Sequence, residues 1–117
     1  MNAPIFHLAM PDEWIRAFDD GTYRMSTRGL SLDEVGFIHC SHREQVEATA
    51  NTFYADVEQL VLLTIDPDRV DADIVEEPPD PGSELRFPHI YGDLPIHAVT
   101  TATLWTRGDG GWSLDDL

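Results

Sequence analysis

The sequence is poor in cysteine, and Cys40 is the single one among 117 residues. One cysteine excludes an intramolecular disulfide and a cysteine-based zinc cluster. The chain also lacks an apolar segment of about 20 residues that would span a bilayer, and a basic start followed by an apolar run that would mark a secretion signal. We therefore expect a soluble, cytoplasmic protein without membrane contacts.

Basic residues are scarce as well. Seven arginines face 22 Asp and Glu, which gives a formal charge of -15 at pH 7. Nucleic-acid binding needs a basic stripe that releases counterions from the phosphates. No such stripe can be assembled here without including many acids, so RNA and DNA are disfavoured as partners. A solvated surface that keeps the protein in solution is the simpler explanation of the acidity.

Apolar residues are present throughout the chain and make up 42% of it, which favours a packed globule over disorder. Residues 1–117 fit a single domain with one core and one cleft. No internal repeat and no linker stand out.

The hydrophobic pattern predicts strands at residues 4–10, 36–41, 60–66, 72–77 and 96–105, the third at the centre of the sheet because it is continuously apolar. Helices are predicted at 11–20, between Pro11 and the stop signal Gly21, and from Ser41 to about Tyr54, with Ser41 and Glu44 as a capping box. Residues 22–35 are expected to form a loop with short extended pieces, residues 78–84 a mobile loop, and the GDGG segment a closing hairpin. Together they predict an α+β fold with a mixed or antiparallel sheet and two helices.

The stretch GFIHCSHREQV, residues 36–46, contains the chain's most suggestive cluster. Because side chains alternate along a strand, Phe37, His39 and Ser41 share one face, and Cys40 lies on the other with Ile38 in the core. A buried cysteine packs as a small hydrophobe. His39 remains the candidate for chemistry, beside a helix N-terminus that could hold a small anion, although a structural histidine fits the spacing equally well.

Two further histidines lie on predicted extended segments. His7 shares a strand face with Ile5, which is typical of a structural histidine. In RFPHIYG, the extended segment places Phe87, His89 and Tyr91 on one side, a surface that suits a flat ring or a sugar, although core packing also explains Phe87. Zinc binding by His7, His39, His42 and His89 is disfavoured, because His39 and His42 straddle the strand-to-helix junction. We expect no metal.

The segments IFHL, GTY, SL, GFIHCS, EQV, LVLLTID and FPHIYG, in this order, closely resemble the family called domain of unknown function 952 (DUF952). The resemblance covers residues 5 to about 99. Members of that family resemble the ADP-ribosyltransferase superfamily in fold, which implies a compact, split β-sheet whose cleft binds NAD in catalytic relatives.

The same resemblance implies roles for individual residues. His7 matches the first-strand histidine that contacts a ribose and the nicotinamide amide. The second position, on the nicotinamide side, falls to His39 or else to Tyr23. Glu77 or His89 would fill the third position, which stabilises the reacting ribose, although no E-x-E motif follows a late strand. The resemblance thus assigns catalytic roles to His39, His89 and Glu77, and we assign ligand contacts to a second set: His7, Tyr23, Ser41, Phe87 and Tyr91.

Three functions fit these residues. The first is an NAD-dependent transferase, with NAD as its co-substrate, that cleaves the nicotinamide-ribose bond. The second is a module that binds NAD or another nucleotide without turnover, which the missing E-x-E motif favours. The third, an RNA 2′-phosphotransferase, conflicts with the charge of -15. The oligomeric state is left open by the sequence.

Overall fold

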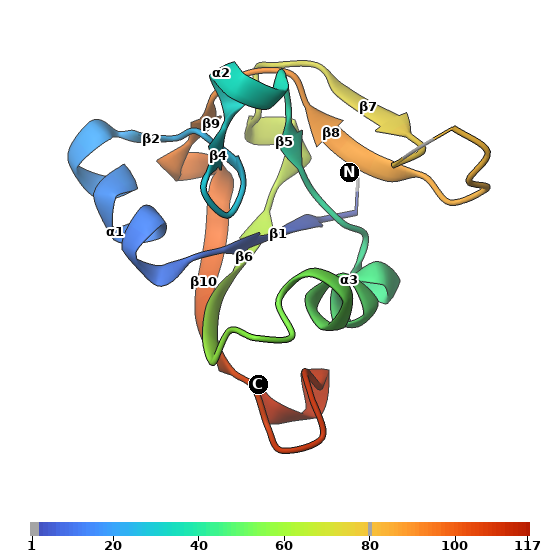
Figure 1. The fold of residues 1–117 in the computed structure, drawn as a ribbon. Coiled ribbons are helices and arrows are strands. Elements are labelled where there is room, and N and C mark those ends of the chain that lie inside the picture. Colours follow the sequence, from blue (N-terminus) through green and yellow to red (C-terminus); the bar gives the residue numbers. More distant parts are fainter. Residues whose placement is uncertain (1–2, 80) are drawn as a thin grey trace.

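Two antiparallel, three-stranded sheets form the frame of the molecule (Figure 1). The computed structural model describes residues 3–79 and 81–117. The first sheet has the order β1 (Ile5–Ala9), β6 (Gln59–Ile65), β10 (Val99–Thr106), and the second the order β5 (Ile38–His39), β8 (Phe87–Ile90), β7 (Ile74–Glu77). Two short pairs are added, β2 (Thr22–Tyr23) with β9 (Leu94–Pro95) and β3 (Met25–Thr27) with β4 (Leu30–Ser31). The α+β prediction is confirmed, and the described strands pair only in the antiparallel sense.

The first sheet is covered on both faces, with α1 on one side and α3 on the other (Figure 1). Alternation along β1 explains this: Ile5 and Ala9 pack with Trp14 of α1, whereas Phe6 and Leu8 pack with Val46 of α3. The continuously apolar β6 lies between β1 and β10, as its pattern predicts.

Helix α1 (Pro11–Asp20) has the predicted bounds. Pro11 occupies its first position, where a missing N–H costs nothing, and Asp12 and Glu13 lie at the positive end of the helix dipole. Gly21 ends the helix with a φ of 80°, a conformation that L side chains rarely adopt.

The predicted cap at Ser41 is wrong. Ser41 is extended, because its backbone N–H donates to the carbonyl of Phe6 and its carbonyl accepts from the N–H of Phe6. A short 3-10 turn, Arg43–Gln45, follows, and α3 (Val46–Phe53) begins only after it. The backbone N–H of His42 donates to the Gln45 side chain at 2.9 Å, one residue later than predicted. His39 is therefore not at a helix N-terminus, and the anion site expected there is not formed.

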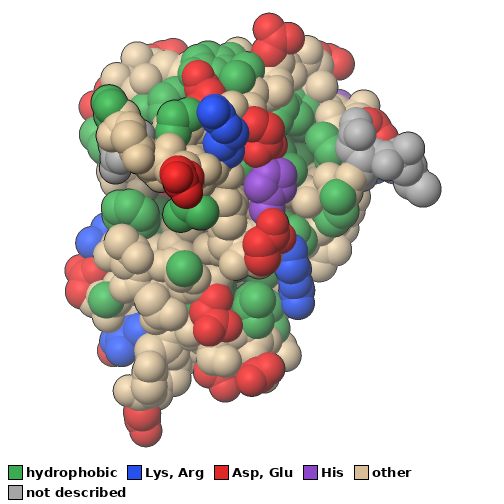
Figure 2. Space-filling view, turned by 90° about the vertical axis from the view of Figure 1, so that its right-hand side faces the viewer, with side chains coloured by type: hydrophobic (Ala, Val, Ile, Leu, Met, Phe, Trp, Pro, Cys, Tyr) green, Lys and Arg blue, Asp and Glu red, His purple; other side chains and the backbone are tan. Residues whose placement is uncertain are grey.

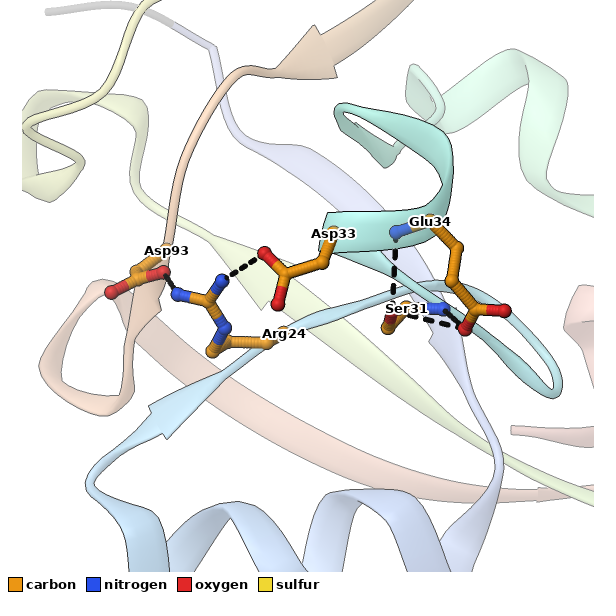
Figure 3. A network of polar contacts seen from close by, with 5 residues as sticks. All are labelled: Arg24, Ser31, Asp33, Glu34 and Asp93. Carbon is orange, nitrogen blue, oxygen red and sulfur yellow. Dashed lines mark hydrogen bonds and ion pairs between the residues drawn. The ribbon is translucent and has the colours of Figure 1, made fainter.

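Residues 22–35 hold more structure than predicted. They contain β2, β3, β4 and the single-turn helix α2 (Leu32–Val35). Ser31 caps α2 and forms a capping box with Glu34, and Arg24 lies between Asp33 of α2 and Asp93, which precedes β9 (Figure 3). These contacts join α2 to the turn before β9.

The last third of the chain follows its predictions in part. The strand predicted at 96–105 begins only at Val99, because Ile96–Ala98 form a 3-10 turn. β7 begins at Ile74, two residues later than expected, and residues 78–84 include position 80, which lies outside the described residues. Gly108 and Gly111 pair across the predicted turn, which brings Trp112 against Trp105 at 4.9 Å between ring centroids. In the part of the chain that the structure describes, no helix has the length and apolar character needed to cross a membrane.

Candidate functional site

Three strands bring three histidines together. His39 of β5 and His89 of β8 are direct cross-strand partners, so their side chains project from the same face. β1 reaches them because Phe6 pairs with Ser41, just after β5. His7 of β1 thereby comes next to the backbone of His39, with 2.6 Å from its Nδ1 to the carbonyl oxygen of His39.

The hydrogen bonds of His7 settle where its proton lies. A carbonyl oxygen can only accept, so Nδ1 of His7 donates to His39. In the neutral ring Nε2 is then the acceptor, and the hydroxyl of Tyr23 donates to it at 2.9 Å. Tyr23 is itself 1% exposed. Both nitrogens of His7 are thus engaged inside the protein, and the ring is held in one orientation.

His89 links His39 to a carboxylate. Nδ1 of His89 lies 2.9 Å from Oε1 of Glu77, and its Nε2 lies 3.3 Å from Nδ1 of His39. The hydroxyl of Tyr91 donates to the same oxygen of Glu77. Phe37 stacks on the His89 ring at 4.0 Å between centroids, with an angle of 18° between the planes. The His89 side chain is 4% exposed, whereas that of Glu77 is 34% exposed.

Burial sets the charges of this cluster. Desolvation lowers the pKa of His7 to about 4. Desolvation and the neighbouring His89 lower the pKa of His39 to about 4. The hydrogen bonds from Tyr91 and His89 lower the pKa of Glu77. At pH 7, His7 and His39 are therefore neutral and Glu77 is a carboxylate.

A cavity of about 290 Å³ opens beside His39. It lies at the lower end of the roughly 300–1,000 Å³ typical of small-molecule pockets. Its described lining is mostly apolar and comprises Ser26, Thr27, Leu30, Val35, Phe37, His39, Phe53, Pro79 and His89. We call this cavity the histidine cleft.

A second pocket of about 20 Å³ shares Ser26, Thr27, His39 and Phe53 with the histidine cleft, and we call it the extension of the cleft. It adds His7, Leu8, Ser41, Thr49 and Tyr54 to the lining, and its volume is close to that of one water molecule. No Arg, Asp or Glu is among the described residues that line the cleft or its extension. Histidines and hydroxyl groups are therefore the polar side chains of the described lining, although acidic side chains are scattered over the surface around α3 and β7 (Figure 2).

The family comparison agrees with the resemblance found in the sequence. The model of the family described as protein of unknown function (DUF952) matches residues 8–102. The chain belongs to the DUF952 family. No curated protein matches this chain.

Solved structures are similar to this chain over nearly its whole length. The chain is similar to the crystal structure of protein CC0527 from Caulobacter crescentus, with 29% identity, a TM-score of 0.81, and coverage of 97% of this chain and 96% of that one. A double mutant of CC0527 gives the same values. The solution NMR structure of CC0527 matches with 28% identity and a TM-score of 0.78.

The structure places some of the predicted site residues in the lining of the cleft and others behind that lining. His39 and His89 line the histidine cleft, His7 and Ser41 line its extension, and Phe87 lies against His39 at 5.2 Å between ring centroids. Tyr23, Glu77 and Tyr91 do not line the cleft; Tyr23 lies behind His7, and the other two lie behind His89.

Seven of the nine described residues that line the cleft were not among the predicted site residues: Ser26, Thr27, Leu30, Val35, Phe37, Phe53 and Pro79. Phe37 shares a strand face with His39, so alternation alone could have found it. Phe53 ends α3, and 59% of its surface is exposed where it lines the cleft. Ser26 and Thr27 carried no local signal, because β3 has only three residues.

Three remaining candidates have structural explanations. Cys40 is 1% exposed, and burial raises its thiol pKa, so it packs as predicted. His42 faces away from the cleft and pairs with Glu76 at 2.7 Å. Across residues 3–79 and 81–117, no group of three or more His, Cys, Asp or Glu side chains is arranged to hold a metal ion.

Proposed function

We propose that the histidine cleft binds NAD or a related nucleotide through a part of the molecule that carries no phosphate, such as its nicotinamide-ribose end. The observation that carries this proposal is the position of His39. It lines a partly aromatic cleft, and its Nε2 makes no hydrogen bond to any residue that the structure describes. In an apolar pocket, a small number of polar groups fixes the orientation of a small ligand.

The composition of the cleft selects the part of the ligand. An aromatic ring can pack against Phe37 and Phe53, while hydroxyl or amide groups can reach His39, Ser26 and Thr27. A phosphate would find no arginine in the described lining, so the phosphates of a dinucleotide belong outside the cleft. This is also what the resemblance to ADP-ribosyltransferases implies for His7 and His39.

Binding without turnover is the second candidate function, and one observation favours it. In the ADP-ribosyltransferases that the family resembles, the third site position stabilises the reacting ribose and is often a carboxylate. Glu77, however, is hydrogen-bonded to Tyr91 and His89 and does not line the cleft. Cleavage of the nicotinamide-ribose bond would need an oxocarbenium-like sugar to be stabilised by other groups.

Titration calorimetry with NAD, ADP-ribose and simple nucleoside phosphates tests the binding proposal. We expect NAD to bind and His39→Ala to weaken it by about tenfold, the value of one hydrogen bond. His97→Ala is the matched control, because His97 is exposed and outside the cleft. The absence of binding at millimolar NAD would refute the proposal.

Prolonged incubation of the protein with NAD, followed by chromatography of the products, separates the two functions. Intact NAD after binding identifies a binding module. Released nicotinamide that disappears in His39→Ala identifies an enzyme.

A further inference from the structure

The hydrogen bonds that join Glu77, His89 and His39 behind the cleft have a defined donor and acceptor at each step. Glu77 is a carboxylate and can only accept, so Nδ1 of His89 carries the proton that lies between them at 2.9 Å. With this one proton on the His89 ring, its Nε2 is then an acceptor. Nδ1 of His39, 3.3 Å away, must donate to it. Because His39 is neutral, its remaining nitrogen, Nε2, carries a lone pair and no proton.

We propose that Glu77 is a positioning residue that acts through His89 to fix the tautomer of His39, so that Nε2 of His39 meets the ligand as a hydrogen-bond acceptor. The group that the cleft recognises at this point is therefore a donor, a hydroxyl or an amide N–H. The statement that the ligand is a donor rests on the function proposed above. The statement about the tautomer of His39 concerns the protein alone.

We call the hydrogen-bonded chain from Glu77 through His89 to His39 the relay. Its neighbouring side chains support the positioning role of Glu77. Tyr91 donates to the same oxygen of Glu77, which keeps the carboxylate in place and charged. Phe37 stacks on His89 and prevents its ring from turning. The relay therefore links the partly exposed Glu77 to the cleft through two rings whose hydrogen bonds all point the same way.

Long-range ¹H–¹⁵N NMR spectra of the histidine rings at pH 7 test the relay in the ligand-free protein. We expect Nδ1 of His39 to be protonated and Nε2 to be bare in the wild type. In Glu77→Gln, the amide can donate as well as accept, so His39 should become a mixture of both tautomers. Glu77 is a third exposed, so this isosteric change should leave the backbone spectrum intact, and Glu77→Asp is the second variant if it does not.

The neighbouring Glu76→Gln is the matched control. Glu76 is also bonded to a histidine, His42, but outside the cleft. We expect it to change the spectrum of His42 and to leave that of His39 as in the wild type. Tyr91→Phe should also leave His39 unchanged, because the carboxylate still accepts from His89. Protonated Nε2 in the wild type, or an unchanged His39 in Glu77→Gln, would overturn the relay.

Addition of NAD to the labelled protein tests the donor statement. We expect Nε2 of His39 to shift while remaining unprotonated, as it does when it accepts a hydrogen bond. A switch to protonated Nε2 would mean that the ligand is the acceptor and would overturn this statement. If no resonance changes at millimolar NAD, the proposed function fails, and the relay is still decided by the ligand-free spectra.

Discussion

His7 is a buried group whose protonation the fold resists. Its pKa is lowered from 6.5 to about 4 in the folded protein, because burial excludes water from the ring. Between these two values the unfolded chain binds more protons than the folded one, so the free energy of unfolding rises with pH. The stabilisation is complete above pH 6.5 and is lost as the pH falls through 4.

This predicts a loss of stability on mild acidification. From pH 7 to pH 5, His7 alone should lower the free energy of unfolding by about 2 kcal/mol, as measured by urea denaturation. His7→Gln, which cannot titrate, should show a pH dependence weaker by about that amount. His97→Gln is the control with wild-type behaviour. Equal pH dependence in His7→Gln and the wild type would show that His7 does not resist protonation.

At the scale of elements, α2 forms one wall of the histidine cleft although it has only four residues. Such a short helix is not stable by itself, so its caps matter more than its propensity. Ser31 caps its start, Gly36 ends it with a φ of 101°, and Arg24 binds Asp33 from outside (Figure 3). Val35 of α2 lines the cleft, so the order of this turn sets the shape of the opening.

Ser31→Ala should therefore loosen α2 locally. Loss of an N-cap costs about 1 kcal/mol, so the amide protons of Glu34 and Gly36 should exchange about fivefold faster, with little change in the melting temperature. Hydrogen-exchange NMR measures this. Ser113→Ala is the matched control, since Ser113 caps a 3-10 turn near the C-terminus. Unchanged exchange at Gly36 would show that Arg24 and the neighbouring strands hold α2 without its cap.

The elements that the sequence predicted well are those with strong local signals. Helix α1 has proline, acids and glycine in the positions that a helix prefers, and β6 is apolar along its length. Ser41 misled the prediction because its spacing to Glu44 satisfied a capping rule, while its backbone was needed to pair with Phe6, 35 positions earlier in the chain. A long-range pairing of this kind leaves no trace in local spacing.

In the candidate site as well, local sequence signals predicted some features, and long-range pairing decided the others. Alternation placed His39 on one strand face and Cys40 on the other, and it put Phe87 and His89 on one side, where both lie against the ring of His39. It could not reveal that Glu77 binds His89 or that Tyr23 binds His7, because these contacts depend on how separate strands pair. The sequence therefore suggested most of these residues, whereas the pairing of β5, β7 and β8 determines which of them bind one another.

At the scale of the whole molecule, repulsion between carboxylates opposes compactness. The formal charge is -15 within a radius of gyration of 13.4 Å. At 0.01 M salt the screening length is about 30 Å, so most of these charges act on one another, whereas at 1 M it is about 3 Å. Among residues 3–79 and 81–117, the arginines that form ion pairs are Arg16, Arg24, Arg28 and Arg69. Their carboxylate partners are at least a third exposed except for Asp66 at 32%.

We therefore expect sodium chloride to stabilise the protein. The midpoint of thermal unfolding should rise by several degrees between about 0.01 M and 0.5 M salt, because screening removes more repulsion than attraction. Asp19→Asn with Asp20→Asn should reduce this rise. Both carboxylates are exposed in the last turn of α1, where they also oppose the helix dipole and no basic residue accompanies them. A midpoint that falls with added salt would show that the arginine ion pairs outweigh the excess of acids.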